Sequence, residues 1–238
     1  MQRAFLYGTL KHATLSAAWV LAAMLPLPTS AQLAPSAQEV SDYKGLHAAT
    51  HRGDVAQIEQ GIAAKADMNA RDRNGRTPIH VAAFAKQADA IRALAKVGAN
   101  LNALDADRYD AVTIASVADD EITLRLLLQL GASAKQITSR YDGSALIAAA
   151  HLGHDGVVRQ LIAAGAALDL VNNLHWTAVI ESIVLGNGGA RHQASLKALI
   201  SAGASLTLTD RQGNTPLQLA KSRGYGEMVK MLEAAGAK

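Results

Sequence analysis

The dipeptide Gly-Ala recurs along the chain at nearly constant spacing. Its glycines are residues 98, 131, 165, 203 and 236, so successive copies lie 33, 34, 38 and 33 residues apart. Self-similarity at a fixed period of about 20–50 residues indicates that one small supersecondary unit is stacked repeatedly. A unit of this size cannot bury its own apolar face, and neighbouring copies must complete the core. The spacing therefore predicts a repeat architecture.

A short motif identifies the unit. Residues 77–82 read Thr-Pro-Ile-His-Val-Ala and lie 21 residues before Gly98, and residues 215–220 read Thr-Pro-Leu-Gln-Leu-Ala at the same distance before Gly236. The first segment resembles the T-P-L-H-x-A signature of the ankyrin repeat. The resemblance implies an all-α solenoid of stacked repeats, each with a β-hairpin and two antiparallel helices. It covers residues 42–238 as six repeats, with a polar C-terminal cap over residues 211–238.

Three columns of the aligned repeats predict the core. The second residue after each motif threonine, or its equivalent, is apolar, and the fifth is small. The second helix carries a leucine column at Leu94, Leu127, Leu161, Leu199 and Leu232. Small residues allow close helix packing, and an apolar helix stripe must be buried. The motif threonine is expected to cap the first helix, and the glycine to take a left-handed conformation after the second. In the first repeat Lys65 replaces this glycine, so we expect that helix end to close differently.

One insertion interrupts the period. Five extra residues follow Gly186, near the segment 187–192, which is rich in glycine. Insertions of this kind are usually tolerated surface loops. The alternative is a contact with a specific partner at one edge of the stack.

Residues 1–31 show the order of features typical of a secretory signal peptide. Arg3 and Lys11 precede an apolar run over residues 13–25, and small residues at 29–31 precede Gln32. The run is shorter than the ~20 residues that span a bilayer, which favours a cleaved leader over a membrane anchor or a buried helix. We expect cleavage before Gln32, a flexible lead over residues 32–41 and no membrane attachment afterwards. The expected location is the periplasm, with full secretion as the alternative.

Charge and motif content argue against nucleic-acid binding and catalysis. Loss of Arg3 and Lys11 with the leader lowers the net charge from +3 to +1, whereas nucleic-acid binders concentrate basic residues on one face. His47 and His51 could share a helix face as metal ligands, but no third ligand is apparent. His47 also falls in the column of His80, which in the family bonds to the hairpin backbone. The sequence lacks a nucleophile motif such as G-x-S-x-G. We expect no enzymatic activity and no cofactor, while metal binding by the two histidines stays open.

The ankyrin resemblance also implies where a partner binds. In that family the concave groove is lined by the hairpin tips and by the ends of the first helices. Transferring these columns gives an apolar and aromatic centre with an arginine rim, a composition typical of protein interfaces. The alternative is that the apolar members pack against adjacent helices and add only stability. The candidate partner-binding residues are Arg73, Arg76, Phe84, Tyr109, Val117, Arg140, Tyr141, His151, Leu152, Trp176, Leu185 and Arg211.

Two function classes fit this groove. The first is a periplasmic adaptor that holds an unidentified protein partner, and the second is a secreted effector or inhibitor acting on a host or competitor protein. A sensor of small molecules or metal, using the histidines, is a weaker third. We expect a monomer. Ankyrin folds host unrelated tasks, so the fold does not choose among these classes.

Overall fold

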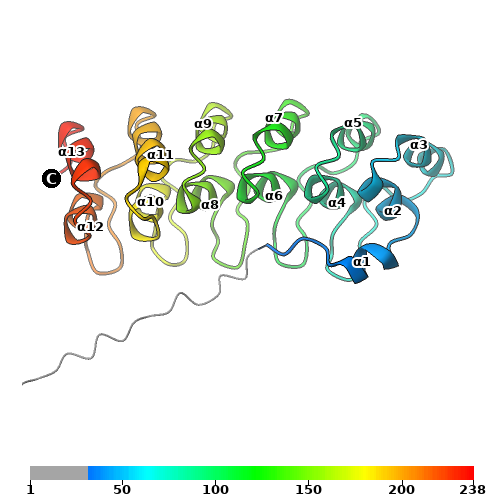
Figure 1. The fold of residues 1–238 in the computed structure, drawn as a ribbon, viewed down its shortest axis with the longest axis horizontal. Helices are drawn as coiled ribbons and strands as arrows, with labels where there is room; N and C mark the ends of the chain where they lie inside the picture. Colours follow the sequence, from blue (N-terminus) through cyan, green and yellow to red (C-terminus); the bar gives the residue numbers. More distant parts are fainter. Residues whose placement is uncertain (1–31) are drawn as a thin grey trace, which may run out of the picture. The chain divides into compact units, whose positions relative to one another are not determined.

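The computed structural model describes residues 32–238 as a row of stacked helix pairs (Figure 1). The predicted leader, residues 1–31, lies outside the described residues. Two layers of helices run along the row, and the inner layer lies nearer the connecting hairpin loops. The inner helices are α2 (Gly45–Arg52), α4 (Pro78–Phe84), α6 (Ala111–Val117), α8 (Ala145–Leu152), α10 (Ala178–Val184) and α12 (Pro216–Ser222). The outer helices are α3 (Val55–Ala63), α5 (Ala88–Lys96), α7 (Glu121–Gln129), α9 (Asp155–Ala163), α11 (Ala190–Ser201) and α13 (Gly226–Ala234).

Side-chain caps start the inner helices at the positions that the repeat register predicts. The Thr177 hydroxyl accepts a hydrogen bond from the Ile180 amide, and the Asp110 carboxylate accepts one from the Thr113 amide at 2.7 Å. At Thr215 the cap is reciprocal, because the Gln218 side chain also accepts a bond from the Thr215 amide. Such caps satisfy amides that have no partner within the helix. The predicted capping role of this column is confirmed at α6, α8, α10 and α12, whereas Lys44 before α2 makes no side-chain cap.

The predicted core columns are buried throughout the stack. All five leucines of the outer-helix column, from Leu94 to Leu232, have exposed fractions of 0%. The small column is equally enclosed, and Ala82, Ala149 and Ser182 each have an exposed fraction of 0%. These small side chains leave room for the inner helices to approach one another. The register therefore sets both the burial of the outer helices and the spacing of the inner ones.

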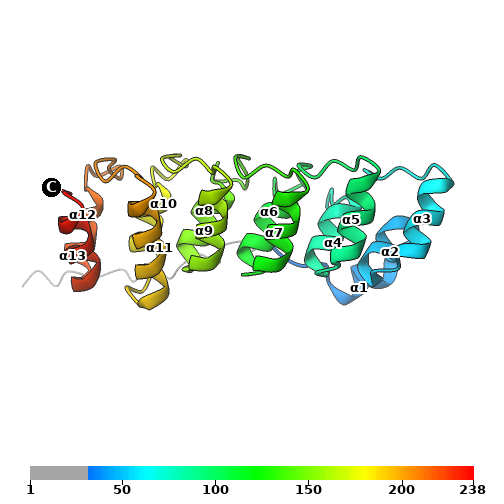
Figure 2. The same cartoon turned by 90° about the horizontal axis from the view of Figure 1, so that it is seen from above.

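The expected hairpins are tight turns rather than paired strands. The structure contains no β-strand over residues 32–238, and Thr138 and Gly143 form a single antiparallel bridge. In the second repeat the Asp72 amide donates to the Arg76 carbonyl at 2.9 Å, and the Asp72 carboxylate accepts from two amides of the same turn. An aspartate or asparagine in this column stabilises the turn through its side chain. Seen from above, the turns line one edge of the row (Figure 2).

The first repeat keeps the left-handed helix end without its glycine. Gly98 and Gly131 have φ angles of 86° and 94°, and Lys65 has a φ of 58° at the equivalent position. The expectation that this end closes differently is wrong. Because a residue with a β-carbon is strained in the left-handed region, Lys65 lowers the stability of the first repeat.

The insertion in the fifth repeat, which contains α10 and α11, is partly helical. Helix α11 has 12 residues, whereas the other outer helices have nine each. Arg191 from its first turn forms ion pairs with Asp119 at 2.7 Å and with Asp155 at 3.5 Å. His192 bonds to the carbonyl of His151. The insertion thus contacts the third and fourth repeats of its own chain.

The lead expected to be flexible contains a helix. Helix α1 (Ala37–Asp42) begins at Ser36 with a capping box, in which the Ser36 hydroxyl and the Glu39 carboxylate each accept a bond from the other's amide. In both views α1 lies beside α2 and α4. None of the helices in the described part of the chain is long and apolar enough to cross a membrane.

Candidate functional site

The candidate site lies on one face of the stack, which we call the tip face. It consists of the hairpin-tip residues and the residues at the C-terminal ends of the inner helices. Nearly identical turns stack here, because each tip bonds to the next: the Ala106 amide donates to the Asn74 carbonyl, and the Asn173 amide to the Tyr141 carbonyl, both at 2.9 Å. These main-chain bonds fix the turns relative to one another. Side chains on the tip face therefore occupy defined positions.

Residues 33–42, which we call the N-terminal segment, cover the first part of the tip face. The Arg76 guanidinium donates to the Glu39 carboxylate at 3.2 Å and to the Leu33 carbonyl at 2.8 Å. The same guanidinium lies 5.5 Å from the centre of the Phe84 ring, a cation–π distance. Arg76 was expected as an exposed rim charge, but its exposed fraction is 7%. Both Arg76 and Phe84 therefore engage their own chain, and the expectation for Arg76 is wrong.

Glu39 is the acid that holds this segment in place. It also pairs with the more exposed Arg73 at 3.5 Å and accepts a bond from the Asn74 amide group. Hydrogen bonds from the amide and hydroxyl of Ser36, together with the charge of Arg76, lower the pKa of Glu39 to about 2. The carboxylate is consequently charged at every physiological pH, and the contact of α1 with the second repeat persists.

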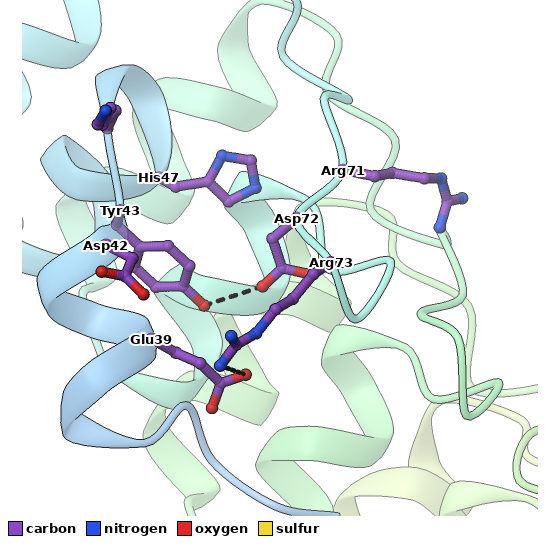
Figure 3. A pocket seen from close by; sticks show the side chains of 8 residues that line it. Glu39, Asp42, Tyr43, His47, Arg71, Asp72 and Arg73 are labelled. Atoms are coloured by element: carbon purple, nitrogen blue, oxygen red, sulfur yellow. Dashed lines mark hydrogen bonds and ion pairs between the residues drawn. The ribbon is translucent and has the colours of Figure 1, made fainter.

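A pocket of about 360 Å³ lies between α1, α2 and the second hairpin (Figure 3). The Tyr43 hydroxyl donates to the Asp72 carboxylate at 3.0 Å in its wall, and Arg71 points away from this pair. Burial and the nearby Asp72 charge raise the pKa of Tyr43 to about 12. The lining contains both acids and bases, and Glu39 pairs with Arg73, so the pocket presents no single charge to a ligand.

His80 and His47, which share one column of the repeats, have structural roles. The His80 Nδ1 accepts a bond from the Thr77 amide at 3.0 Å, which leaves the proton on Nε2 to bond to the Tyr109 carbonyl. Burial lowers the pKa of His80 to about 4. The His47 Nε2 bonds to the Arg76 carbonyl in the same manner. Over residues 32–238 no group of three or more metal-ligating side chains is present.

The middle of the tip face carries the predicted Tyr109, Val117 and Tyr141, all half-buried. Burial raises the pKa of Tyr109. Beside it, Arg140 forms an ion pair with Asp107 at 3.5 Å, and both side chains are largely exposed. An exposed pair of this kind adds little stability. Of these predicted residues, Arg140 thus has a partner within its own chain.

Apolar side chains are open to solvent farther along the tip face. Leu152, Leu174 and Leu185 have exposed fractions of 40%, 37% and 42%, although the neighbouring core leucines are fully buried. Leu152 and Leu185 end the inner helices of the fourth and fifth repeats, and Leu174 lies in the fifth hairpin. Trp176, expected as the exposed anchor, is half-buried and packs against the core. The leucines are therefore the exposed apolar members.

A buried carboxyl lies beneath these leucines. Glu181 in α10 has an exposed fraction of 4%, and one oxygen accepts a bond from the Asn172 amide group at 2.9 Å. Its other oxygen makes no hydrogen bond and lies 3.5 Å from the Nδ1 of His151. Burial raises the pKa of Glu181 to about 7 and lowers that of His151. The sequence analysis missed Glu181 and Asn172, although an acid in an apolar helix was a visible signal.

Two arginines frame the far end of the tip face. Arg211 from the sixth hairpin donates to the Asn173 carbonyl, and Arg223 at the end of α12 donates to the Val184 carbonyl at 3.1 Å. Both carbonyls belong to the preceding repeat, so each side chain is held across a repeat boundary. Among residues 32–238 neither guanidinium forms an ion pair, and both keep their charge uncompensated.

Comparison with known proteins gives consistent matches. Residues 46–140 and 146–238 match the family model described as ankyrin repeats (3 copies). The ankyrin repeat protein YahD of Escherichia coli (strain K12) is 35% identical over 190 residues, which cover 79% of this chain and 94% of YahD.

Solved structures show the same fold. An ankyrin repeat domain from Acinetobacter baumannii AYE is 42% identical, with a TM-score of 0.76 over 81% of this chain and 98% of that one. A chain in the complex of the predatory endopeptidase Bd0816 from Bdellovibrio bacteriovorus with the immunity protein Bd3460 is 26% identical, with a TM-score of 0.67 over 81% of this chain and 98% of that one.

Proposed function

This chain belongs to the ankyrin-repeat family, and from that premise we propose that it is an adaptor that binds a protein partner through the tip face of its fourth to sixth repeats. Ankyrin repeats generally mediate protein–protein interaction, and the family is typically non-enzymatic. The partner surface is narrower than the sequence predicts, because the N-terminal segment covers the tip face of the second repeat.

The observation that carries the proposal is the exposure of Leu152, Leu174 and Leu185. Apolar side chains that remain in water cost solvation free energy, which association with another protein recovers. The polar and charged residues around them provide the rim that such interfaces have. The leucines are fixed on stacked repeats, so little ordering is needed for binding.

We further propose that the chain is exported by residues 1–31 and works in the periplasm after cleavage before Gln32. A secreted effector or inhibitor is the second candidate. The complex of the Bdellovibrio endopeptidase with an immunity protein favours a protective or inhibitory role for this fold. Cell fractionation separates the two candidates, since an effector accumulates in the medium. Mass spectrometry of the recovered chain should find Gln32 as its first residue, and an intact Met1 form as the main species would contradict export.

The interface is tested by capture from periplasmic extract on the immobilised chain. We expect at least one captured protein to be lost with Leu185→Asp and retained with Ile122→Asp. Ile122 is a matched control because it is also exposed but lies on outer helix α7, away from the tip face. Melting curves check that both variants are folded. Equal capture by the two variants would move the interface away from these leucines.

A further inference from the structure

The charges around the exposed leucines are strongly asymmetric. The tip-face columns of the last three repeats contain Arg140, Tyr141, Gly143, His151 and Leu152, then Asn173, Leu174, Trp176, Val184 and Leu185, then Arg211, Gln212, Asn214, Ser222 and Arg223. Three of these are arginines and none is an acid. A protein whose net charge is only +3 thus places an unbalanced positive charge on this surface.

The nearby acids neutralise Arg140 but neither of the other two arginines. Asp142 is paired with Arg108 at 2.9 Å, and Asp107 with Arg140. Asp210 is buried and accepts bonds from the amides of its own turn, including those of Gln212 and Asn214. These acids therefore leave Arg211 and Arg223 uncompensated.

Glu181 does not alter this balance at the surface. Its carboxyl is buried behind the half-buried ring of His151, and burial raises its pKa to about 7. A large share of it is therefore uncharged near neutral pH. The acid lies beneath the leucines instead of among the surface groups that a partner would contact.

Arg211 and Arg223 are also positioned in advance. Each guanidinium is anchored to a main-chain carbonyl of the fifth repeat, which fixes the side chain but removes none of its charge. A guanidinium has five N–H donors, so one bond to a carbonyl leaves donors for a carboxylate. Anchored cations lose less conformational entropy on binding than free ones.

We propose that the tip face of the fourth to sixth repeats recognises an acidic protein segment, whose carboxylates pair with Arg211 and Arg223 while its apolar side chains cover Leu152 and Leu185. This inference rests on the proposed function and specifies the partner's chemistry. A single-stranded nucleic acid is the other polyanion to consider, but it needs exposed aromatic rings for base stacking. Here the exposed apolar residues are leucines, and Trp176 packs against the core.

A random peptide library displayed on phage tests the proposal without knowledge of the natural partner. The library is selected on the full chain after depletion on the Leu185→Asp variant, so that only peptides requiring the tip face survive. We expect the selected peptides to carry net negative charge together with leucine-like residues. Neutral or net basic peptides, or a selection that yields no such peptide, would overturn the inference.

Charge variants then locate the contact on a selected acidic peptide. The pair Arg211→Gln and Arg223→Gln should weaken its binding about tenfold or more at low salt, and added salt should reduce the difference. The control pair Arg92→Gln and Arg125→Gln removes the same charge from exposed positions on outer helices α5 and α7, and should leave binding unchanged. Equal losses in the two pairs would show only a general charge effect and overturn the assignment.

Three further outcomes distinguish a failure of the proposed adaptor function from a failure of the proposed partner chemistry. A labelled DNA strand of 20 nucleotides is tested alongside the peptides. If it binds through Arg211 and Arg223 more tightly than any selected peptide, the proposed ligand is a nucleic acid and not an acidic protein. If acidic peptides fail while capture from extract still depends on Leu185, the adaptor function stands and only the partner's charge is wrong. If capture from extract fails and acidic peptides bind, the binding surface is as proposed, but its natural ligand is not a protein of the periplasmic extract.

Discussion

The Oε2 atom of Glu181 and the Nδ1 atom of His151 lie 3.5 Å apart across the boundary between the fourth and fifth repeats. Glu181 comes from the middle of α10 and His151 from the last turn of α8, so the pair depends on how these two helices pack. Neither side chain builds the apolar core. Their titration provides a measure of the local environment beneath the exposed leucines.

Stability should therefore depend on pH through Glu181. The pKa of Glu181 is about 7 in the folded chain, against an ordinary value of 4.5, so the folded state binds more protons between these pH values. The stabilisation is complete below about pH 4.5 and is lost as pH rises through 7, by about 1–3 kcal/mol. Denaturant unfolding from pH 5 to 8 should show Glu181→Gln gaining stability relative to wild type as pH rises. A constant difference across this range would contradict the raised pKa.

His151 contributes with the opposite sign, since burial lowers its pKa and stability is lost as pH falls below its unfolded value. The comparison with Glu181→Gln keeps His151 in both proteins, so the difference in unfolding free energy reports mainly on Glu181.

Leu127→Ala should destabilise the stack by about 2–5 kcal/mol, because it removes a fully buried side chain and leaves a cavity. Ile122→Ala on the same helix is the control, and its largely exposed side chain should cost far less. Chemical denaturation measures both. Since repeats couple mainly to their neighbours, the Leu127 variant should also show a broader transition. Equal midpoints for the two variants would place Leu127 outside the core.

Lys65→Gly should stabilise the first repeat by about 0.5–1 kcal/mol. Glycine takes the left-handed conformation without strain, which outweighs the entropy it loses on folding. The gain should appear in thermal unfolding, and Lys65→Ala, which retains a β-carbon, should not reproduce it. An unchanged or lower midpoint for Lys65→Gly would show that the backbone at Lys65, after α3, is not strained.

Glu39→Gln should loosen the N-terminal segment from the second repeat. The substitution keeps an acceptor but removes the charge that pairs with Arg73 and Arg76. Amide hydrogen exchange in residues 33–42 should become at least several-fold faster, while exchange in α7 stays the same. Asp42→Asn on the same helix is the control. Matching exchange in Glu39→Gln and wild type would show that other contacts hold the segment.

The repeat period made most of the fold predictable. Core positions such as Leu127 and caps such as Thr177 recur in fixed columns, so each copy supports the assignment of the others. The candidate site was less predictable, because a column states where a backbone position lies and not what its side chain contacts. Arg76 occupies a tip column and is nevertheless buried, since its partners Glu39 and Leu33 come from a segment outside the repeats.

Glu181 escaped prediction for a related reason. Its partners His151 and Asn172 lie in other elements, and only packing brings the three together. The helical part of the insertion after Gly186 was not predicted, because the sequence gives its length but not its secondary structure. Part of it extends α11, where Arg191 reaches Asp119.

The contacts of α1 bear on how the chain should be prepared for experiments. A recombinant fragment that begins at residue 42, where the predicted repeats start, would lack Glu39 and Leu33. It would leave the Arg76 guanidinium without either partner. Such a fragment would present a cationic surface that the intact chain does not have. Acidic proteins that bind this fragment but not the intact chain would be artefacts of truncation.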